Sequence, residues 1–363
     1  MATDEEELAR LRGAIDEIDE EVLRLISRRA RHAQAIGEVK KSAGQHSFWS
    51  PKREAEVLQK VEAQNGGPLP GAFLRRWYLE LMSACLALEK PVRVAYFGPE
   101  GSYTHTAALQ YFGSSAEAIP EVSIGEVFRK TECGGVDFGV VPVENSTEGM
   151  VSHTLDMFLS SPLCICGETL LRIHHHLLCK EEKLESVARV YAHPQSLAQC
   201  RRWLERHLPQ VECIAASSNA EAVRIAVKEE KAAAIAGKNA AHIYGLPILA
   251  SHLEDEPSNT TRFLVLGSQQ RKPTGEDKTS ILSSCLDEPG ALVHLLGPLA
   301  RHGISMTKIE SRPSKRGLWN YVFFLDIEGH MDEPVVVEAF EEMKKASILF
   351  KVLGSYPRAQ LKH

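Results

Sequence analysis

The chain has 363 residues, of which 44% are hydrophobic and 25% charged, and its formal net charge is −6 at pH 7. Because this length exceeds one typical domain, we expect two or three domains. The ordinary globular composition and the negative charge argue against a general nucleic-acid-binding protein. The sequence has no apolar run of membrane-spanning length, and its acidic first residues do not resemble a secretory signal.

The eight cysteines are scattered along the chain. Only Cys164 and Cys166 stand close together, and they lack the CxxC spacing of many metal and redox sites. Cysteines of this kind are typical of reduced thiols in the cytoplasm, where disulfides are rare. We therefore expect a cytoplasmic protein.

Residues 1–91 have the pattern of an all-α domain. From Glu5 to about Lys41, apolar residues recur with the seven-residue spacing of a packed helix. This helix would be roughly 55 Å long, which is more than the width of a small domain. We expect a second chain to cover it and the protein to be a homo-oligomer, either a dimer or higher. Two further helices are predicted from Pro51 to about Gln64 and from about Ala72 to Glu89.

The second zone, residues 92–268, alternates short apolar strands with helical segments. Strands are predicted at VRVAYFG, FGVVPVE, RVYAH, AAAIAG and TRFLVLG, and helices at SLAQCRRWLERHL and NAEAVRIAVKEE. This alternation predicts an α/β domain with a mainly parallel sheet.

The third zone covers residues 269–363. The polar linker SQQRKPTGEDK, which begins at Ser268, leads into it. Strands follow at TSILSSCLD, ISMTKIESRP, WNYVFFLDIEG and FKVLGSYP, with helices at GALVHLLGPLARHG and from about Glu333 to Ala346. The order βαββαβ predicts a ferredoxin-like α+β domain.

The first helix carries basic residues where a core is expected. Arg29 falls on the apolar stripe, and Arg12 and Lys40 lie at its edge. A buried cation is costly unless an anion meets it. Together with Arg53 and Glu54 of the second helix, these residues suggest a cage for a small polyanion, since Arg suits paired recognition of carboxylates. The alternatives are salt bridges to another helix and snorkelling of the side chains.

The segments LRGAIDEIDEEVLRLISRRARHAQAIGEVK, SPKREAEVL and LMSACLALE resemble the three helices of the all-α chorismate mutases. The resemblance covers about the first 90 residues and implies an intertwined dimer whose site takes residues from both chains. By matched position, it implies that Arg12, Arg29 and Arg53 hold the substrate carboxylates and that Glu54 holds a ring hydroxyl. Lys40 and the end of the third helix, with Cys85 and Glu89, would lie at the ether oxygen.

The sequence departs from that family at three positions in or next to these segments. Glu89 stands where many members have Gln, Cys85 stands at a position that is often Ser, and Ser50 stands where a charged residue is common. The rearrangement of chorismate to prephenate is pericyclic, so the protein has to hold a compact conformer and stabilise negative charge on the ether oxygen. Glu89 can donate a hydrogen bond to that oxygen only when it is protonated.

The stretch PVENSTEG, residues 142–149, places polar side chains after a buried strand, which is where open α/β sheets bind ligands. The alternative is a turn and helix cap, with Asn145, Ser146 or Thr147 capping and Glu148 favoured by the helix dipole. Together with GPEGSYTHTAA, YAHPQSLAQC and NTTRFLVLG, the stretch resembles prephenate dehydratase over about 175 residues. This resemblance implies two α/β subdomains, like those of periplasmic binding proteins, with a cleft between them.

The same resemblance implies the residues of the dehydratase site. Thr261 would give a proton to the departing hydroxyl, and Arg262 would bind the pyruvyl side chain or be structural. The side chains expected along the cleft are Glu144, Asn145, Ser146 and Thr147, with Thr261 and Arg262 on its opposite side. Those expected around its rim are Ser102, Thr104, His193 and Gln199. Ser102 and Thr104 could instead cap a helix, and His193 could be a structural histidine. The usual Ser before His193 is Ala192 here.

The segment RIHHHLLCK suggests a metal site, but we interpret it as a strand. On a strand only His174 and His176 would share a side, and the sequence offers no third ligand nearby. We expect neither a metal nor a cofactor.

The third zone resembles an ACT domain, and GALV and ESRP are the motifs of its phenylalanine-sensing members. The resemblance implies an L-phenylalanine site at a subunit interface. Its first part would be formed by backbone groups of Gly290, Ala291, Leu292 and Val293, and the pocket would be closed by Glu310, Ser311, Arg312 and Pro313. Binding there can regulate only if it favours one arrangement of the subunits.

These resemblances identify the chain as a bifunctional chorismate mutase and prephenate dehydratase that is inhibited by L-phenylalanine. Its partners would be the small molecules chorismate, prephenate and phenylalanine, and neither nucleic acid nor membrane. Two alternatives stay open. One is an active dehydratase with a decayed mutase, marked by Cys85, Glu89 and Ser50. The other is a non-catalytic ligand-sensing regulator.

We expect mutase activity to decline as pH rises, because protonated Glu89 is the hydrogen-bond donor and an ordinary glutamate has a pKa of about 4.3. Glu89→Gln should flatten this profile, since an amide donates at every pH. Mutase rates of both proteins measured across pH test this. A profile unchanged by the substitution would contradict the prediction.

Overall fold

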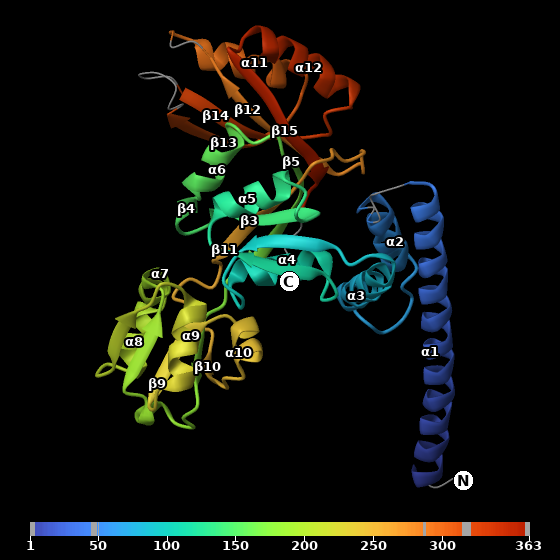
Figure 1. The fold of residues 1–363 in the computed structure, drawn as a ribbon, viewed down its shortest axis with the longest axis vertical. Helices are drawn as coiled ribbons and strands as arrows, with labels where there is room; N and C mark the ends of the chain where they lie inside the picture. The colour runs from blue at the N-terminus through green and yellow to red at the C-terminus, as the bar shows by residue number, and fades with distance from the viewer. Residues whose placement is uncertain (1–3, 45–48, 50, 286–287, 314–320, 360–363) are drawn as a thin grey trace. The chain divides into compact units, whose positions relative to one another are not determined.

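The computed structural model describes residues 4–44, 49, 51–285, 288–313 and 321–359. It divides into two compact units (Figure 1). One runs to Val92 and includes Phe112–Glu117, and the other comprises Arg93–Tyr111 and the chain from Ala118 onwards. Within the described ranges, no helix is both long and apolar enough to cross a membrane.

The first unit is all-α, as predicted. Its helices are α1 (Asp4–Ser42), α2 (Pro51–Ala63) and α3 (Gly71–Glu89). In this unit α1 runs on as a single helix well past α2 and α3 (Figure 1). Its apolar stripe is exposed in the single chain, at Leu8, Leu11, Ile15, Ile18, Val22, Leu25, Ile36 and Val39.

The second unit contains the two α/β subdomains implied by the resemblance, here called lobes. The first lobe has a sheet in the order β2-β1-β3-β11-β5, with β4 paired to β3. Its strands are β1 (Arg93–Phe97), β2 (Glu117–Glu121), β3 (Phe138–Asn145), β4 (Gly149–Met150), β5 (Cys164–Arg172) and β11 (Thr260–Gly267). Its helices are α4 (Tyr103–Phe112), α5 (Ile124–Glu132) and α6 (Ser152–Phe158).

The second lobe has a sheet in the order β10-β6-β9-β7-β8. Its strands are β6 (His176–Cys179), β7 (Arg189–Ala192), β8 (Glu212–Ala215), β9 (Ala232–Ala236) and β10 (Ile248–Ser251). Its helical elements are η1 (Leu184–Ser186), α7 (Pro194–Gln199), α8 (Arg201–His207), α9 (Asn219–Lys228) and α10 (Lys238–Tyr244).

The expectation of a mainly parallel sheet is wrong. The pairs β1–β3, β7–β8 and β7–β9 are parallel, whereas β11 is antiparallel to β3 and β5, and β6 is antiparallel to β9 and β10. In each lobe, the reversed strand is the one that arrives from the other lobe. It enters at the end of the sheet that faces that lobe, so it runs against its neighbours.

The segment RIHHHLLCK is not one strand either. Strand β5 ends at Arg172 and β6 begins at His176, so residues 173–175 cross between the lobes. Residues 252–259 cross back, from β10 to β11. Backbone hydrogen bonds join these two crossing segments, from Ile173 N–H to the Asn259 carbonyl (2.8 Å) and from Leu253 N–H to the His175 carbonyl (2.9 Å).

The C-terminal part has the predicted βαββαβ order. Its elements are β12 (Asp277–Ser284), α11 (Ala291–Arg301), β13 (Met306–Pro313), β14 (Tyr321–Glu328), α12 (Pro334–Lys345) and β15 (Leu349–Pro357). The sheet order is β13-β14-β12-β15, with antiparallel neighbours and β13 at one edge.

The C-terminal sheet and the first lobe share one hydrophobic core. Leu282, Phe324 and Leu353 lie in the same buried cluster as Val143 and Phe158. At Gly354 the backbones come so close that an added Cβ would lie 2.2 Å from the Ile165 carbonyl oxygen. The two parts therefore pack as one body.

Candidate active sites and ligand-binding face

Strands β3 and β11 bring two predicted dehydratase residues together in one sheet, so the expectation that Thr261 lies across the cleft from Asn145 is wrong. Asn145 lies opposite Thr261, and Glu144 lies opposite Arg262. Because successive residues of a strand point to opposite faces, Asn145 and Thr261 share one face of the sheet. Asn145 Nδ2 donates a hydrogen bond to Thr261 Oγ1 at 2.8 Å.

From this pair, hydrogen bonds continue towards the second lobe, and we call the series the amide chain. Asn145 Nδ2 also donates to Asn259 Oδ1 at 2.8 Å, and Asn259 Nδ2 donates to Gln199 Oε1 at 3.1 Å. His175 Nε2 lies 2.9 Å from the same Gln199 oxygen, and His175 Nδ1 lies 2.8 Å from the Tyr103 hydroxyl. The amide chain thus links the two lobes through both crossing segments, with Asn259 in one and His175 in the other.

The proton positions in the amide chain follow from its last amide. Gln199 Nε2 donates to Glu148 Oε1 at 3.2 Å, so its Oε1 faces Asn259 and His175 and accepts from both. His175 therefore carries its proton on Nε2, and the single proton of the Tyr103 hydroxyl is shared between His175 Nδ1 at 2.8 Å and the His174 carbonyl at 2.9 Å. Burial lowers the pKa of His175 and raises the pKa of Tyr103, which keeps the imidazole neutral and the phenol protonated.

The hydroxyl of Thr261 is available as a hydrogen-bond donor. Its oxygen accepts from Asn145, and the described part of the chain offers no acceptor for its own O–H. The residue is buried, with 9% of its surface exposed. Thr261 can therefore act as a hydrogen-bond or proton donor to a molecule bound against this face.

Three residues that the sequence analysis does not predict complete the amide chain. Asn259 is the first letter of the quoted NTTRF motif, Tyr103 lies inside GSYTH, and His175 lies in the triple histidine. The motif positions of Asn259 and Tyr103 were a usable signal. The role of His175 depends on the crossing segment, which the sequence had suggested to be a strand.

The stretch after Asn145 forms the turn of the alternative interpretation but caps no helix, so the helix-cap part of it is wrong. Asn145 Oδ1 accepts from the backbone N–H groups of Thr147 (3.0 Å) and Glu148 (3.1 Å), which closes a turn into β4. The Thr147 hydroxyl lies 2.6 Å from the same oxygen and 3.1 Å from Asn259 Oδ1, so it joins the amide chain. Ser146 Oγ instead accepts from the backbone N–H of Thr260.

Three other predicted residues make no hydrogen bond to the amide chain within the described ranges. Ser102 Oγ accepts from His105 N–H at the start of α4, and His193 Nδ1 accepts from Gln195 N–H at the start of α7. Thr104 is buried in α4. The capping alternative for Ser102 and the structural alternative for His193 agree with these contacts.

Glu144 and Arg262 lie on the opposite face from Thr261, so the expectation that Glu144 lies along the cleft is wrong. Glu144 forms an ion pair with Lys308 of β13. Arg262 donates to Glu168 (2.6 Å), Asp326 (2.6 Å) and the Tyr356 hydroxyl (2.9 Å). Burial alone would lower the pKa of Arg262, but these partners hold it above its usual range. Both side chains thus connect the first lobe to the C-terminal sheet.

In the helical unit, Lys40 and Glu89 come together as expected. Lys40 Nζ lies 3.4 Å from Glu89 Oε2, where the ends of α1 and α3 meet. Gly37 makes this approach possible, because an added Cβ would lie 2.9 Å from Cγ and 3.0 Å from Cβ of Glu89. Cys85 is buried one turn before Glu89.

The two predicted mutase residues on α2, Arg53 and Glu54, have local partners. Glu54 Oε2 accepts from Trp49 Nε1 at 2.9 Å, and Arg53 Nη1 lies 3.3 Å from Glu56 Oε2. Arg53 remains exposed in the single chain.

Within one chain, Arg12 cannot reach the other predicted mutase residues. It precedes Arg29 by 17 residues on the same straight helix, which places the two about 26 Å apart at 1.5 Å per residue. One chain therefore brings together only part of the predicted mutase set.

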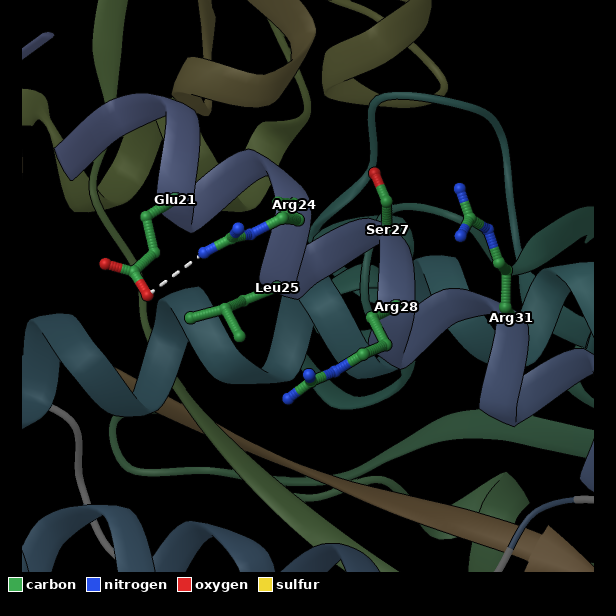
Figure 2. A pocket seen from close by; sticks show the side chains of 6 residues that line it. All are labelled: Glu21, Arg24, Leu25, Ser27, Arg28 and Arg31. Carbon is green, nitrogen blue, oxygen red and sulfur yellow. Dashed lines mark hydrogen bonds and ion pairs between the residues drawn. The ribbon is translucent and has the colours of Figure 1, made fainter. Parts of the chain in front are cut away.

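A separate shallow hollow lies on α1. Figure 2 shows its six lining side chains, with Glu21 paired to Arg24. All six come from α1, and they are Glu21, Arg24, Leu25, Ser27, Arg28 and Arg31. At 100° per residue the three arginines lie a quarter turn or more around the helix from Arg29, so the hollow is distinct from the predicted mutase site.

The predicted phenylalanine-binding residues occupy two segments. Gly290 adopts a left-handed conformation (φ 84°) just before α11, and Ala291, Leu292 and Val293 form the helix start, with Val293 72% exposed. Glu310, Ser311, Arg312 and Pro313 end the edge strand β13. Arg312 Nε lies 3.3 Å from Asp156 Oδ1 in the first lobe. Across the described residues, no hydrogen bond or ion pair joins the two segments.

The triple histidine has further ligand-type neighbours, so the sequence argument against a third ligand is wrong. His174 does not belong to a strand, and it meets His252 and Glu254 from the other crossing segment. The three offer ligand atoms within 4.8 Å of one another. Burial lowers the pKa of the nearby His176 to about 4, and its Nδ1 has no partner among the described residues.

The fold and these sites match known families in order along the chain. Residues 11–90 match chorismate mutase type II, residues 94–271 match prephenate dehydratase and residues 279–344 match the ACT domain. The bifunctional chorismate mutase/prephenate dehydratase of Stutzerimonas stutzeri is 51% identical over 361 residues, covering 98% of this chain and 99% of that protein. Its counterpart in Pseudomonas aeruginosa is 50% identical, covering 99% of this chain and 100% of that protein.

A solved structure agrees for the second unit. Prephenate dehydratase of Arthrobacter aurescens, in complex with L-Phe, superposes with a TM-score of 0.68 at 32% identity, covering 74% of this chain and 90% of that one. The three domains in this order define an enzyme of aromatic amino-acid synthesis with an attached ACT domain. The chain belongs to the bifunctional chorismate mutase/prephenate dehydratase family.

We predict that Gly37→Ala lowers mutase activity at least tenfold, because the new methyl group would displace Glu89 from Lys40. Dehydratase activity on added prephenate should be unchanged. Gly13→Ala is the matched control, since nothing lies within 4 Å of a Cβ built there. Equal mutase rates for the two variants would contradict the prediction.

Proposed function

We propose that this chain rearranges chorismate to prephenate in its helical unit and converts prephenate to phenylpyruvate, carbon dioxide and water at the face of Thr261. L-Phenylalanine would inhibit the dehydratase through the ACT domain. The observation that carries the dehydratase part is the buried Thr261 hydroxyl, held by Asn145 with its own proton unengaged. The scattered free cysteines fit a cytoplasmic enzyme.

In the dehydratase reaction, the bond between the ring and its carboxylate breaks as the ring hydroxyl leaves. The electron pair of the broken carbon–carbon bond moves into the ring, which becomes aromatic, and carbon dioxide departs. The hydroxyl takes a proton to leave as water. Thr261 is the donor we assign, and its oxygen regains a proton from solvent in each turnover. Asn145 fixes the donor oxygen, and the amide chain holds Asn145 in place.

The position of Arg262 suits this chemistry. A cation clamped on the departing carboxylate would oppose decarboxylation, because it would stabilise the charge that has to be lost. Arg262 is instead engaged by Glu168, Asp326 and Tyr356 on the other face of β11. We therefore assign Arg262 a structural role.

For the mutase, we propose a site shared between two chains of a homodimer. Lys40 and Glu89 would face the ether oxygen, and Arg29 and Arg53 would bind carboxylates with Arg12 of the other chain. Two features support sharing: the exposed apolar stripe of α1 and the distance of Arg12 from the remaining residues. The Lys40 cation and the protonated Glu89 carboxyl would stabilise the negative charge that develops on the ether oxygen.

For regulation, we propose that phenylalanine binds between the start of α11 and β13 of a neighbouring subunit. The first amides of a helix have no partner within the helix and favour a carboxylate. Strand β13 lies at the sheet edge, where a second ACT sheet can pair. The Arthrobacter dehydratase named as a complex with L-Phe supports the choice of ligand.

We predict that the purified chain forms phenylpyruvate from chorismate alone, above a control without enzyme. Saturating L-phenylalanine should suppress the formation of phenylpyruvate more strongly than it suppresses the consumption of chorismate. If chorismate persists while added prephenate reacts, the mutase has decayed. If neither substrate reacts, the chain is a ligand-sensing regulator, and equal dehydratase rates with and without phenylalanine would exclude the inhibition.

We predict that Thr261→Val lowers the dehydratase kcat by two orders of magnitude or more, since it removes the proton donor at nearly constant volume. Thr261→Ser keeps the hydroxyl and should retain most activity. Mutase activity, measured in the same samples, serves as the folding control. A valine variant with the rate of the serine variant would remove Thr261 from the mechanism.

We predict that mixed dimers of Arg12→Ala and Arg29→Ala chains recover mutase activity. Each parent dimer lacks one arginine in both sites, whereas a mixed dimer has one intact site and should show about half of the wild-type rate. Differently tagged chains, co-expressed and purified on both tags, provide the sample. Mixed dimers as inactive as the parents would mean that each site lies within one chain.

A further inference from the structure

Three potential metal ligands converge where the two crossing segments run side by side. His174 comes from the first segment, and His252 and Glu254 come from the second. His174 Nδ1 lies 2.7 Å from Glu254 Oε1 and 3.1 Å from His252 Nδ1, and His252 Nδ1 lies 3.4 Å from the same carboxylate oxygen. None of the three belongs to the proposed mutase or dehydratase sites.

Protons satisfy this triangle only in part. With Nδ1 protonated on both histidines, His174 donates to Glu254 Oε1 at 2.7 Å, whereas His252 reaches the same oxygen only at 3.4 Å, and the two nitrogens remain 3.1 Å apart. If His252 Nδ1 donates to His174, the His174 lone pair faces the carboxylate at 2.7 Å. A single cation between the three atoms would satisfy all of them.

The triangle has the size of a metal first shell. Zinc bonds to His nitrogen and carboxylate oxygen are about 2.0–2.1 Å long, so ligand atoms of a tetrahedral site lie about 3.3 Å apart. With the observed separations, a cation at that bond length would sit about 1 Å out of the plane of the three atoms. Its fourth position would remain for water or a further ligand.

We propose that a divalent cation of the zinc class binds to His174, His252 and Glu254 and fastens the two crossing segments together. Two histidines and one carboxylate are an established ligand set for Zn²⁺.

The surroundings of the triangle support this assignment. Glu254 Oε2 accepts from His175 N–H at 2.8 Å, which fixes the carboxylate from behind in the way outer-shell partners hold metal ligands. His176 lies beside His252, with 5.3 Å between ring centroids, and its buried Nδ1 is unpartnered among the described residues. His252 has 62% of its side chain exposed, which gives a cation access from solvent.

The test uses the full chain without a histidine tag, reduced and stripped of metal with a chelator. Zn²⁺ is then titrated in competition with a chromophoric chelator. We expect one site per chain that His252→Asn weakens at least tenfold and that His242→Ala leaves unchanged. Asparagine suits the left-handed backbone of His252 (φ 58°) but is not a usual zinc ligand, and His242 is an exposed histidine on α10.

Two further readouts separate this site from adventitious binding. Co²⁺ should give the intense visible bands of a tetrahedral site in the wild type and in His242→Ala but not in His252→Asn. Zn²⁺ should raise the thermal midpoint of the same two proteins only, because it links segments that separate on unfolding. All eight cysteines are present in each protein, so wild-type binding that persists in His252→Asn would place the metal on thiols and overturn the proposal. An absence of one-per-chain binding in the wild type would overturn it equally.

Discussion

The dehydratase unit depends on the two-sided arrangement of strand β11. Thr261 and Arg262 are neighbours, so they point to opposite faces of the sheet. One face carries the donor hydroxyl and the amide chain, and the other carries the buried ion pairs with Glu168 and Asp326. Removing one partner of a buried charge costs roughly 3–5 kcal/mol, so Arg262 fixes the register of β11 strongly. A slip by one residue would exchange the two faces and destroy both.

This arrangement also defines how the ACT domain can influence the dehydratase. Asp326 of β14 and Lys308 of β13 belong to the ACT sheet, and they pair with Arg262 and Glu144 of the first lobe. These two residues are adjacent to Thr261 and Asn145. A ligand shifts an equilibrium only as far as it binds the two states differently. Any movement of β13 or β14 therefore has to carry these ion pairs along or break them, and either result acts one residue away from Thr261, the proposed proton donor.

The sequence predicted best those elements whose signals are local. The three helices and the βαββαβ order follow from periodicity and from Gly and Pro positions, which the structure reproduces. The motif NTTRF predicted Thr261 as a site residue but on the opposite side of the cleft from Asn145, whereas the structure pairs the two on adjacent strands of one sheet. The sequence could not assign Glu144 to a face, because a strand with both faces buried does not alternate between polar and apolar residues.

The sequence also could not predict the contacts between segments that lie far apart along the chain. The ligand-type cluster joins His174 to residues 78 and 80 positions later, and only the return of the chain beside its own first crossing brings them together. The same return places Asn259 between Asn145 and Gln199. A parallel sheet was expected because helices alternate with strands, but the crossings themselves are extended and reverse one strand in each lobe.

The mutase unit differs from the dehydratase in what one chain can complete. Eight apolar side chains of the α1 stripe are each 38–67% exposed. Since full burial of such a side chain contributes about 1.5–3 kcal/mol, hiding the exposed half of each contributes about 1 kcal/mol, or about 16 kcal/mol for both chains of a dimer. That is of the same order as the roughly 4–15 kcal/mol cost of association, so burial of the stripe would offset most or all of that cost. The same contact is the one that would bring Arg12 to the opposite chain. In the proposed dimer, association and mutase chemistry would therefore depend on one surface, whereas the amide chain beside Thr261 is complete within a single chain.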